Sequence, residues 1–217
     1  MATLFPFRAL RPAPPVASRV AAVPYDVVST DEARALATDA LSFLHVSRAE
    51  IDLPAAIDPY SDAVYARARE NFDRLRREAP LVTDGTPSLY AYRLRMGAHE
   101  QVGIAGCYSL DEYARDIVKK HERTRRDKED DRTRHVLTLR ANAEPVFLTY
   151  RGRPEIGGLS DASTAGAPLY DFTAPDGVRH TVWRIADPAP FVEAFRAVPL
   201  AYVADGHHRS ASAWRAR

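Results

Sequence analysis

The chain has 217 residues, of which 46% are hydrophobic and 27% charged, a composition ordinary for a soluble globular protein. Its net charge of +1 gives no indication of bulk nucleic-acid binding or of attachment to a membrane surface. No apolar run has the length of a transmembrane helix, and residues 1–8 lack the features of a signal peptide. Cys107 is the only cysteine, which excludes an intrachain disulfide and makes a cytoplasmic location the expectation.

The first part of the chain predicts a loop followed by a capped helix. Three prolines within residues 11–15 favour an extended, irregular path over the surface. Further on, Ser29 or Thr30 is placed to cap a helix whose first turn contains the negative charge of Glu32. Asp26 lies just before this helix and is interpreted as a structural residue.

A long amphipathic helix is predicted over residues 60–79. Its apolar side chains recur at helical spacing and fall on one face: Val64, Ala68, Phe72 and Leu75. Pro80 ends this helix, because proline has no backbone N–H and its ring clashes with the preceding turn.

Pairs of strands and a further helix are predicted later in the chain. Residues 89–96 and 101–108 predict a β-hairpin, and residues 169–173 and 178–185 predict a second strand pair. A helix opened by proline follows over residues 188–197. Few successive strands are separated by regular helical crossovers, so we expect an α+β fold.

The chain is expected to form a single α+β domain over residues 1–217, with room for an inserted subdomain over residues 51–190. It stops at Arg217, barely two turns into a helix predicted over residues 210–217. A helix that short is marginal unless it packs on something else. We therefore expect this sequence to be the N-terminal part of a longer protein.

Residues 119–134 form the most charged stretch and allow two interpretations. One is a solvated helix with pairs of opposite charge along its surface. The other is a loop in which four polar side chains converge on an anionic ligand: His121, Glu122, Lys128 and Arg132. In that arrangement Glu122 is a plausible base, and Lys128 or Arg132 is a clamp for the ligand's charge.

A turn near the end of the chain has the composition of an anion site. It joins an apolar strand predicted over residues 200–204 to the helix predicted over residues 210–217. The first turn of a helix offers N–H groups without intrahelical partners, at the positive end of the macrodipole. Gly206 allows a phosphate to approach the backbone closely, and Arg209 offers a planar fork of donors.

The same turn contains two histidines and an aspartate. His207 and His208 can donate hydrogen bonds or transfer protons near neutral pH. Adjacent histidines on a helix point about 100° apart, so they are poor joint ligands for one metal ion. The alternative interpretation is an ordinary Asp-Gly turn in which Asp205 caps the helix.

Several well-known site motifs are missing. The sequence has no glycine-rich phosphate loop, no dinucleotide-binding fingerprint and no nucleophile elbow. It also lacks a His-Glu-x-x-His motif and paired cysteines for a metal ion.

Four blocks of sequence carry a resemblance to a known family. They are Pro-Tyr-Asp-Val-Val-Ser at 24–29, Ser-Phe-Leu-His-Val at 42–46, the charged segments 120–124 and 128–132, and Ala-Asp-Gly-His-His-Arg at 204–209. Together they resemble the uncharacterised bacterial and archaeal family catalogued as domain of unknown function 1015. Members of that family continue well past the last block, in agreement with the expectation of a longer protein.

The last block also resembles the signature of a wider superfamily that contains ParB proteins, sulfiredoxins and free-serine kinases. This likeness implies a ParB/sulfiredoxin-like mixed core with a large insertion. It further implies that Gly206 and Arg209 hold phosphate, with Asp205, His207 and His208 lining the site. The free-serine kinases are the most similar there, because they have an Asp-Gly-His-x-Arg form of the motif. A sulfiredoxin-like site is disfavoured because this turn has no cysteine, and a ParB-like one because no helix-turn-helix is evident.

The expected function is that of a nucleotide-dependent phosphotransferase acting on a small hydroxylated metabolite, with free serine as the leading candidate. ATP or ADP with Mg²⁺ is the expected cofactor, and phosphoryl transfer asks mainly for positioning and charge neutralisation. Glu122 or His121 would accept the hydroxyl proton, with His207 as the third catalytic residue.

Two other functions stay open. One is a nucleotide-binding switch without small-molecule turnover. The other is a metal-dependent hydrolase built from four histidines: His121, His135, His207 and His208. No nucleic-acid or membrane partner is expected, and the oligomeric state is left open.

Overall fold

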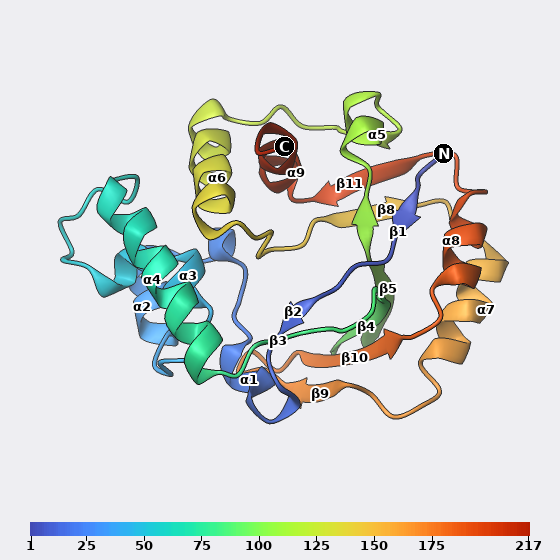
Figure 1. The fold of residues 1–217 in the computed structure, drawn as a ribbon, viewed down its shortest axis with the longest axis horizontal. Coiled ribbons are helices and arrows are strands. Elements are labelled where there is room, and N and C mark those ends of the chain that lie inside the picture. Colours follow the sequence, from blue (N-terminus) through green and yellow to red (C-terminus); the bar gives the residue numbers. More distant parts are fainter. The chain divides into compact units, whose positions relative to one another are not determined.

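The computed structural model describes residues 1–217 and has an α+β fold (Figure 1). The chain divides into two compact units, each assembled from three separate segments. Unit 1 comprises residues 1–18, 82–121 and 148–204, and unit 2 comprises residues 19–81, 122–147 and 205–217. The inserted subdomain expected over residues 51–190 stays a prediction.

The largest sheet of unit 1 has four antiparallel strands in the order β5-β4-β10-β9. Its strands are β4 (Leu89–Met96), β5 (His99–Ala105), β9 (Tyr170–Thr173) and β10 (Arg179–Ile185). Both predicted strand pairs are therefore confirmed. Each turn contains a glycine with positive φ, at Gly97 and Gly177, where the left-handed backbone favours a residue without a side chain.

The predicted strand over residues 101–108 is interrupted at Gly106, so that β6 (Cys107–Tyr108) pairs with β1 (Leu4–Phe5) instead. A Cβ atom at Gly106 would lie 2.5 Å from the Leu4 side chain and 2.7 Å from that of Leu89. Only glycine lets the backbone pass so close to the core.

The other elements of unit 1 are short. A three-stranded sheet has the order β7-β11-β8, with β11 parallel to β7. Its strands are β7 (Val118–Lys119), β8 (Phe147–Tyr150) and β11 (Ala201–Asp205). The remaining pieces are β2 (Leu10–Arg11), which pairs with β3 (Val82–Thr83), and the helices η1 (Pro14–Val16), α1 (Ala17–Val20), α5 (Leu110–Ala114), α7 (Pro154–Ser163) and α8 (Ala189–Phe195).

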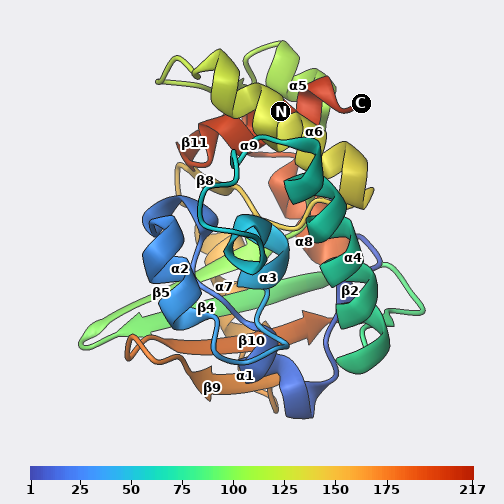
Figure 2. The ribbon, with the colours of Figure 1, turned by 90° about the vertical axis from the view of Figure 1, so that its left-hand side faces the viewer.

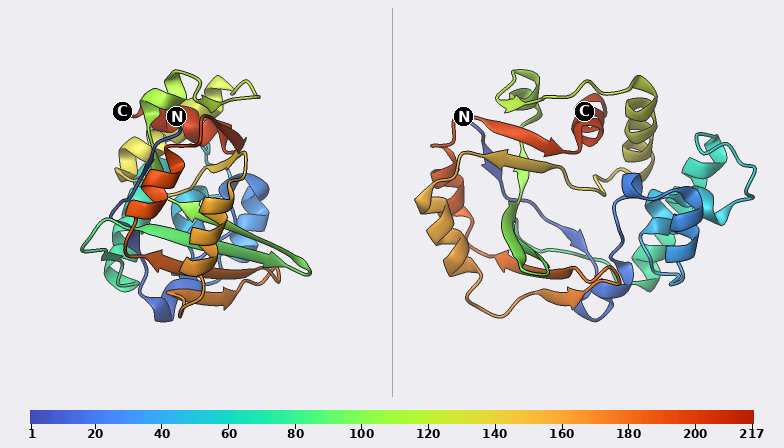
Figure 3. Two further views of the ribbon diagram at one scale, coloured as in Figure 1. Left: turned by 90° about the vertical axis from the view of Figure 1, so that its right-hand side faces the viewer. Right: turned by 180° about the vertical axis from the view of Figure 1, so that it is seen from behind.

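The hydrophobic core of unit 1 includes the helix predicted over residues 188–197. Within α8, Phe191, Ala194 and Phe195 lie on one face and are buried. The neighbouring α7 lies beside it (Figure 3) and was not expected, because its Gly157 and Gly158 disfavour a helix. Its only buried residue, Ile156, packs into the same core, so tertiary packing overrides propensity here.

Unit 2 is helical. It contains η2 (Tyr25–Val27), α2 (Thr30–Leu36), α3 (Leu44–Ser47), η3 (Ala49–Asp52), α4 (Asp62–Glu78), α6 (Arg126–Leu139) and α9 (His207–Arg215). Ser29 and Glu32 form the predicted capping box of α2. None of the helices, the longest of which is α4, combines the length and apolar character needed to cross a membrane.

The predicted amphipathic helix is α4. The four apolar residues named from the sequence are all buried, and α4 packs against α3, which lies beside it in Figure 2. On α6, which also packs against α4, the buried residues are mostly polar: Asp131, Arg132, Thr133, His135 and Leu139. The charged stretch is thus a loop over residues 120–125 followed by a helix with a buried polar face, and neither sequence interpretation described both parts.

Candidate functional site

The predicted strand, turn and helix are present at the end of the chain. Strand β11 ends at Asp205, and α9 begins at His207, three residues earlier than the sequence predicted. Gly206 occupies the cap position with φ +92°, and no side chain bonds to the helix N-terminus. The alternative in which Asp205 caps the helix is therefore wrong, because Gly206 holds the cap position.

Gly206 and Arg209 fit closely together. A Cβ atom at Gly206 would lie 3.2 Å from two guanidinium atoms of Arg209, so a side chain there would meet Arg209 as well as a left-handed backbone. The Arg209 side chain is only 11% exposed. The absence of a side chain at Gly206 thus allows the guanidinium to fold back over the start of its own helix.

Arg209 gathers two carboxylates at this helix start. Its Nη2 lies 2.5 Å from the Asp205 carboxylate and 3.5 Å from that of Asp26, and its Nη1 donates to the carbonyl oxygen of Pro145. The Asp205 side chain is 64% exposed and that of Asp26 is 39% exposed. Both carboxylates therefore remain accessible to a ligand from solvent, although Arg209 itself is largely covered.

Asp26, interpreted from the sequence as a structural residue, lies next to Arg209 at the predicted phosphate site. It belongs to η2, which is 183 positions away from Arg209 along the chain. The only sequence signal was its membership of the Pro-Tyr-Asp block that carries the family resemblance.

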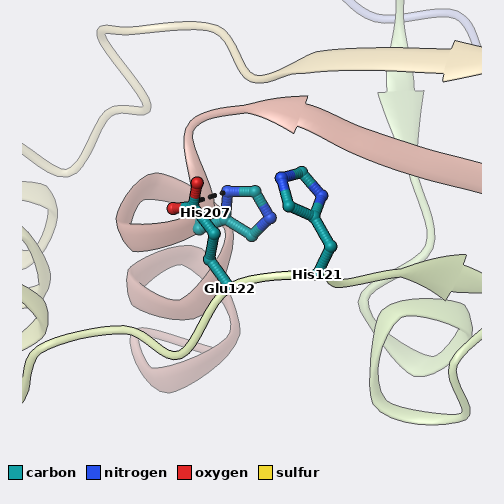
Figure 4. Close-up of side chains that lie close together, drawn as sticks. All are labelled: His121, Glu122 and His207. Carbon is teal, nitrogen blue, oxygen red and sulfur yellow. Dashed lines mark ion pairs between the residues drawn. The ribbon is translucent and has the colours of Figure 1, made fainter.

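Glu122 and His207, two of the predicted catalytic residues, lie close together. Glu122 lies in the loop before α6, and its carboxylate is 3.6 Å from Nδ1 of His207, the first residue of α9 (Figure 4). The His207 side chain is 5% exposed, whereas that of Glu122 is 62% exposed. A buried imidazole therefore orients a solvent-accessible carboxylate. His121, also drawn in Figure 4, is the residue bonded to Glu122 on its N-terminal side and is the last residue of unit 1.

His208 connects the same loop to α9. Its Nε2 accepts a hydrogen bond of 3.1 Å from the backbone N–H of Arg125, which assigns the ring proton to Nδ1. This bond fixes the segment that carries Glu122. The role of His208 is therefore best described as positioning.

Lys128 and Arg132, the two residues considered for the predicted charge clamp, have different partners. Lys128 donates to the hydroxyl of Tyr60 at 2.8 Å. Arg132 donates from Nε to the Asp131 carboxylate at 2.9 Å, and its Nη2 forms an ion pair of 2.8 Å with the same carboxylate. Its guanidinium lies 4.1 Å from the centre of the Tyr25 ring. A shared role on one ligand stays a prediction for this pair.

A small pocket of about 30 Å³ adjoins Arg132 and Arg209 within unit 2. Its walls come from α6, the segment after it, and α9: Arg132, His135, Val136, Asn142, Ala143, Glu144, Arg209 and Ser212. Burial raises the pKa of Glu144 to about 7, against the opposing effect of the Arg132 and Arg209 charges. No sequence motif had marked Glu144, which stands alone between alanine and proline.

A comparison with protein-family models matches residues 4–217 to the family described as "Protein of unknown function (DUF1015)". The chain belongs to this family. The DUF1015 match confirms the resemblance drawn from the four sequence blocks. No curated protein and no solved structure matches the chain. The DUF1015 family brings no assigned activity, so function has to be argued from the site, and the ParB/sulfiredoxin likeness stays a prediction.

Proposed function

We propose that this DUF1015 protein is a nucleotide-dependent phosphotransferase that acts on a small hydroxylated metabolite, with free serine as the leading acceptor. One observation carries the proposal: α9 starts at left-handed Gly206 with no side-chain cap, and Arg209 and two exposed carboxylates surround that start. Uncapped N–H groups and a guanidinium are suited to phosphate oxygens.

The nucleotide's phosphates occupy the N-terminus of α9. Their oxygens accept hydrogen bonds from the first N–H groups of the helix, and Arg209 exchanges part of its contact with Asp205 for a phosphate oxygen. Asp205 and Asp26 offer the carboxylate oxygens that Mg²⁺ prefers. The ion, when bound, neutralises charge on the transferred phosphoryl group.

Glu122 is the base in this proposal. Its carboxylate accepts the proton of the acceptor's hydroxyl, the hydroxyl oxygen bonds to the terminal phosphorus, and the bond from that phosphorus to the leaving nucleotide oxygen breaks. His207 holds the carboxylate in place through its 3.6 Å ion pair. His121, next to Glu122, is the alternative base.

The test incubates the protein with Mg²⁺ and ATP or ADP in a pool of free amino acids and small hydroxy metabolites, and mass spectrometry detects phosphorylated products. We expect O-phosphoserine. Glu122→Gln should lower its rate of formation about 10²- to 10⁴-fold, the range for loss of a general base. Arg209→Lys, which keeps the charge and loses the planar fork of donors, should lower it about 10²-fold.

Matched variants separate these roles from general damage. Arg215→Lys lies on the same helix, where Arg215 bonds to Glu129 and Asp130, and Glu70→Gln removes an exposed carboxylate on α4. Both should stay within about twofold of the parent. Nucleotide binding without any phosphorylated product would contradict the proposal and favour the switch.

The metal-dependent hydrolase stays a prediction, and the structure gives contacts of two of the four histidines that the sequence proposed for it. Nε2 of His135 lies 3.0 Å from the Val46 carbonyl oxygen, and Nε2 of His208 is bonded to Arg125. These contacts occupy one ring nitrogen of each histidine.

A further inference from the structure

The pocket beside Arg209 has no role in the phosphoryl transfer described above, and charged side chains of both signs line it. Its volume of about 30 Å³ is far below the 300 Å³ or more that drug-sized ligands and cofactors fill. It can therefore hold a few atoms, such as the charged end of a small metabolite, and cannot hold a nucleotide.

Two buried arginine atoms in this region have no hydrogen-bond partner. Nη1 of Arg132 and Nε of Arg209 are both covered from solvent and donate to no acceptor in the structure. Buried N–H groups are almost always paired, so each of these two donors calls for a partner from outside the chain, either water or a ligand. Both arginines line the pocket.

The pocket also contains an acceptor of the opposite charge. The Glu144 carboxylate lies 3.9 Å from Nη1 of Arg132, which is too far for a hydrogen bond, and its side chain is 16% exposed. Arg132 and Glu144 thus form an ion pair without a hydrogen bond, and a ligand that carries both charges can bond to both groups.

We propose that this pocket binds the α-ammonium and α-carboxylate groups of an amino-acid acceptor, with Glu144 facing the ammonium and Arg132 and Arg209 facing the carboxylate. The choice of ligand rests on the proposed function, which calls for a small hydroxylated metabolite. Arg209 borders both the pocket and the start of α9. A short hydroxylated side chain, as in serine, therefore extends from this pocket toward the phosphate site.

Other small hydroxylated compounds fit these charges less well. A hydroxy acid such as glycerate has no ammonium, so its carboxylate faces Glu144 without compensation. An amino alcohol such as ethanolamine leaves the two arginine donors unpaired. A neutral sugar satisfies neither charge, and each of these mismatches leaves a buried charge or donor without a partner.

Binding should depend on pH through Glu144, whose carboxylate is about half ionised near pH 7. An ammonium ligand requires the ionised form. The affinity for L-serine should therefore rise about tenfold from pH 6 to pH 8, in proportion to the ionised fraction. His135 stays neutral over this range because burial lowers its pKa to about 4. The other charged groups that act on Glu144 are Arg132 and Asp131 on α6, Arg209 on α9, and Asp26 on η2.

The test is calorimetric titration of the full chain with L-serine, D-glycerate and ethanolamine, first without nucleotide and then with Mg²⁺ and a non-hydrolysable ATP analogue. We expect L-serine to bind at least tenfold more tightly than either fragment-like compound. Glu144→Gln should weaken L-serine binding at least tenfold and abolish its pH dependence. Arg132→Lys, which keeps the charge and loses the planar fork, should also weaken it tenfold.

Arg134→Lys is the matched control. Arg134 lies on the same helix, is bonded to Asp62 and does not line the pocket, so its replacement should leave L-serine affinity within twofold. Thermal melts of every variant establish that loss of binding is not loss of fold, and Glu144→Gln preserves side-chain shape.

The outcomes separate this inference from the proposed function. Amino-acid binding that depends on Glu144 without any phosphorylated product would retain the pocket assignment and overturn the phosphotransferase. Phosphorylation of a compound without an ammonium group would retain the phosphotransferase and overturn the pocket assignment. Equal binding of L-serine by the parent and Glu144→Gln, or no binding in either titration, would overturn the pocket assignment.

Discussion

At the scale of single residues, the site is arranged by what Gly206 and Glu144 do to their neighbours. Gly206 adopts φ +92° and leaves the space that the Arg209 guanidinium fills. Glu144 is a buried carboxylate next to two cationic side chains, and burial still outweighs their effect on its pKa. Gly206 therefore shapes the proposed phosphate site, and Glu144 determines how the adjoining pocket responds to pH.

The first prediction concerns the pH dependence of stability at Glu144. Its folded pKa of about 7 lies above the ordinary 4.5, so between these values the unfolded chain loses the proton while the folded protein keeps it. The free energy of unfolding thus falls as pH rises from 4.5 to 7. Glu144→Gln cannot ionise, and its stability relative to the parent should rise over that window by up to about 3 kcal/mol.

Urea unfolding of parent and variant between pH 4.5 and 8 measures this difference. His135 acts in the opposite direction, because burial lowers its pKa to about 4. Its contribution to the free energy of unfolding is complete above pH 6.5 and is lost as pH falls toward 4. Both proteins share that effect, and it cancels in the comparison. Glu70→Gln, on the exposed face of α4, should show no such trend. A difference that stays constant from pH 5 to 8 would refute the assignment.

At the scale of elements, α6 contributes four buried polar side chains to unit 2, those of Asp131, Arg132, Thr133 and His135. Asp131 accepts a hydrogen bond of 2.7 Å from the Tyr65 hydroxyl of α4 and one of 2.9 Å from Nε of Arg132, with which it also forms an ion pair. These bonds hold Arg132 against the Tyr25 ring and orient its remaining nitrogen toward Glu144. The packing of α4 on α6 therefore supports the pocket through one buried carboxylate.

Removal of the Tyr65 hydroxyl is the second prediction. Tyr65→Phe leaves a buried carboxylate with one fewer donor, which should lower the free energy of unfolding by about 1–3 kcal/mol. Tyr60→Phe removes a hydroxyl that accepts from Lys128 on an exposed side chain, and its effect should be below about 0.5 kcal/mol. Denaturant titration measures both, and equal effects would argue against a specific role for the buried bond.

At the scale of the whole molecule, each unit is assembled from segments far apart in sequence. Phe195 on α8 illustrates this in unit 1: its ring contacts those of Tyr108 and Tyr150, with centroids 6.4 and 5.1 Å away. The core of unit 1 is thus complete only when residues from three separate stretches of chain have met. Long-range contacts of this kind have to overcome loop-closure entropy before they stabilise the fold.

The third prediction tests this core. Phe195 is 1% exposed, so Phe195→Ala should lower the free energy of unfolding by about 3–5 kcal/mol through lost burial and the remaining cavity. Val102→Ala, at a residue that is 40% exposed on β5, should change it by less than about 1 kcal/mol. Chemical denaturation followed by tryptophan fluorescence is suited to the measurement, because Trp183 belongs to the same core.

The sequence by itself determined the local structure of this protein. Apolar spacing indicated α4, alternation and turn glycines indicated both hairpins, Ser29 and Glu32 indicated a capping box, and the Asp-Gly-His-His-Arg stretch indicated the strand, turn and helix of the site. These features depend on residues within a few positions of one another, and side-chain periodicity reports them directly.

Only the tertiary structure decided which distant side chains share the site. Asp26 meets Arg209 across 183 positions, and Glu144 meets Arg132 where the chain turns back after α6. Sequence periodicity states which face of a helix is buried and does not state what that face meets. The charged stretch shows the limit, since the partners of Lys128 and Arg132 differ although the two residues are four positions apart on one helix. The ligand chemistry of this protein is determined by such long-range pairings, because burial and opposing charges are properties of the packed chain.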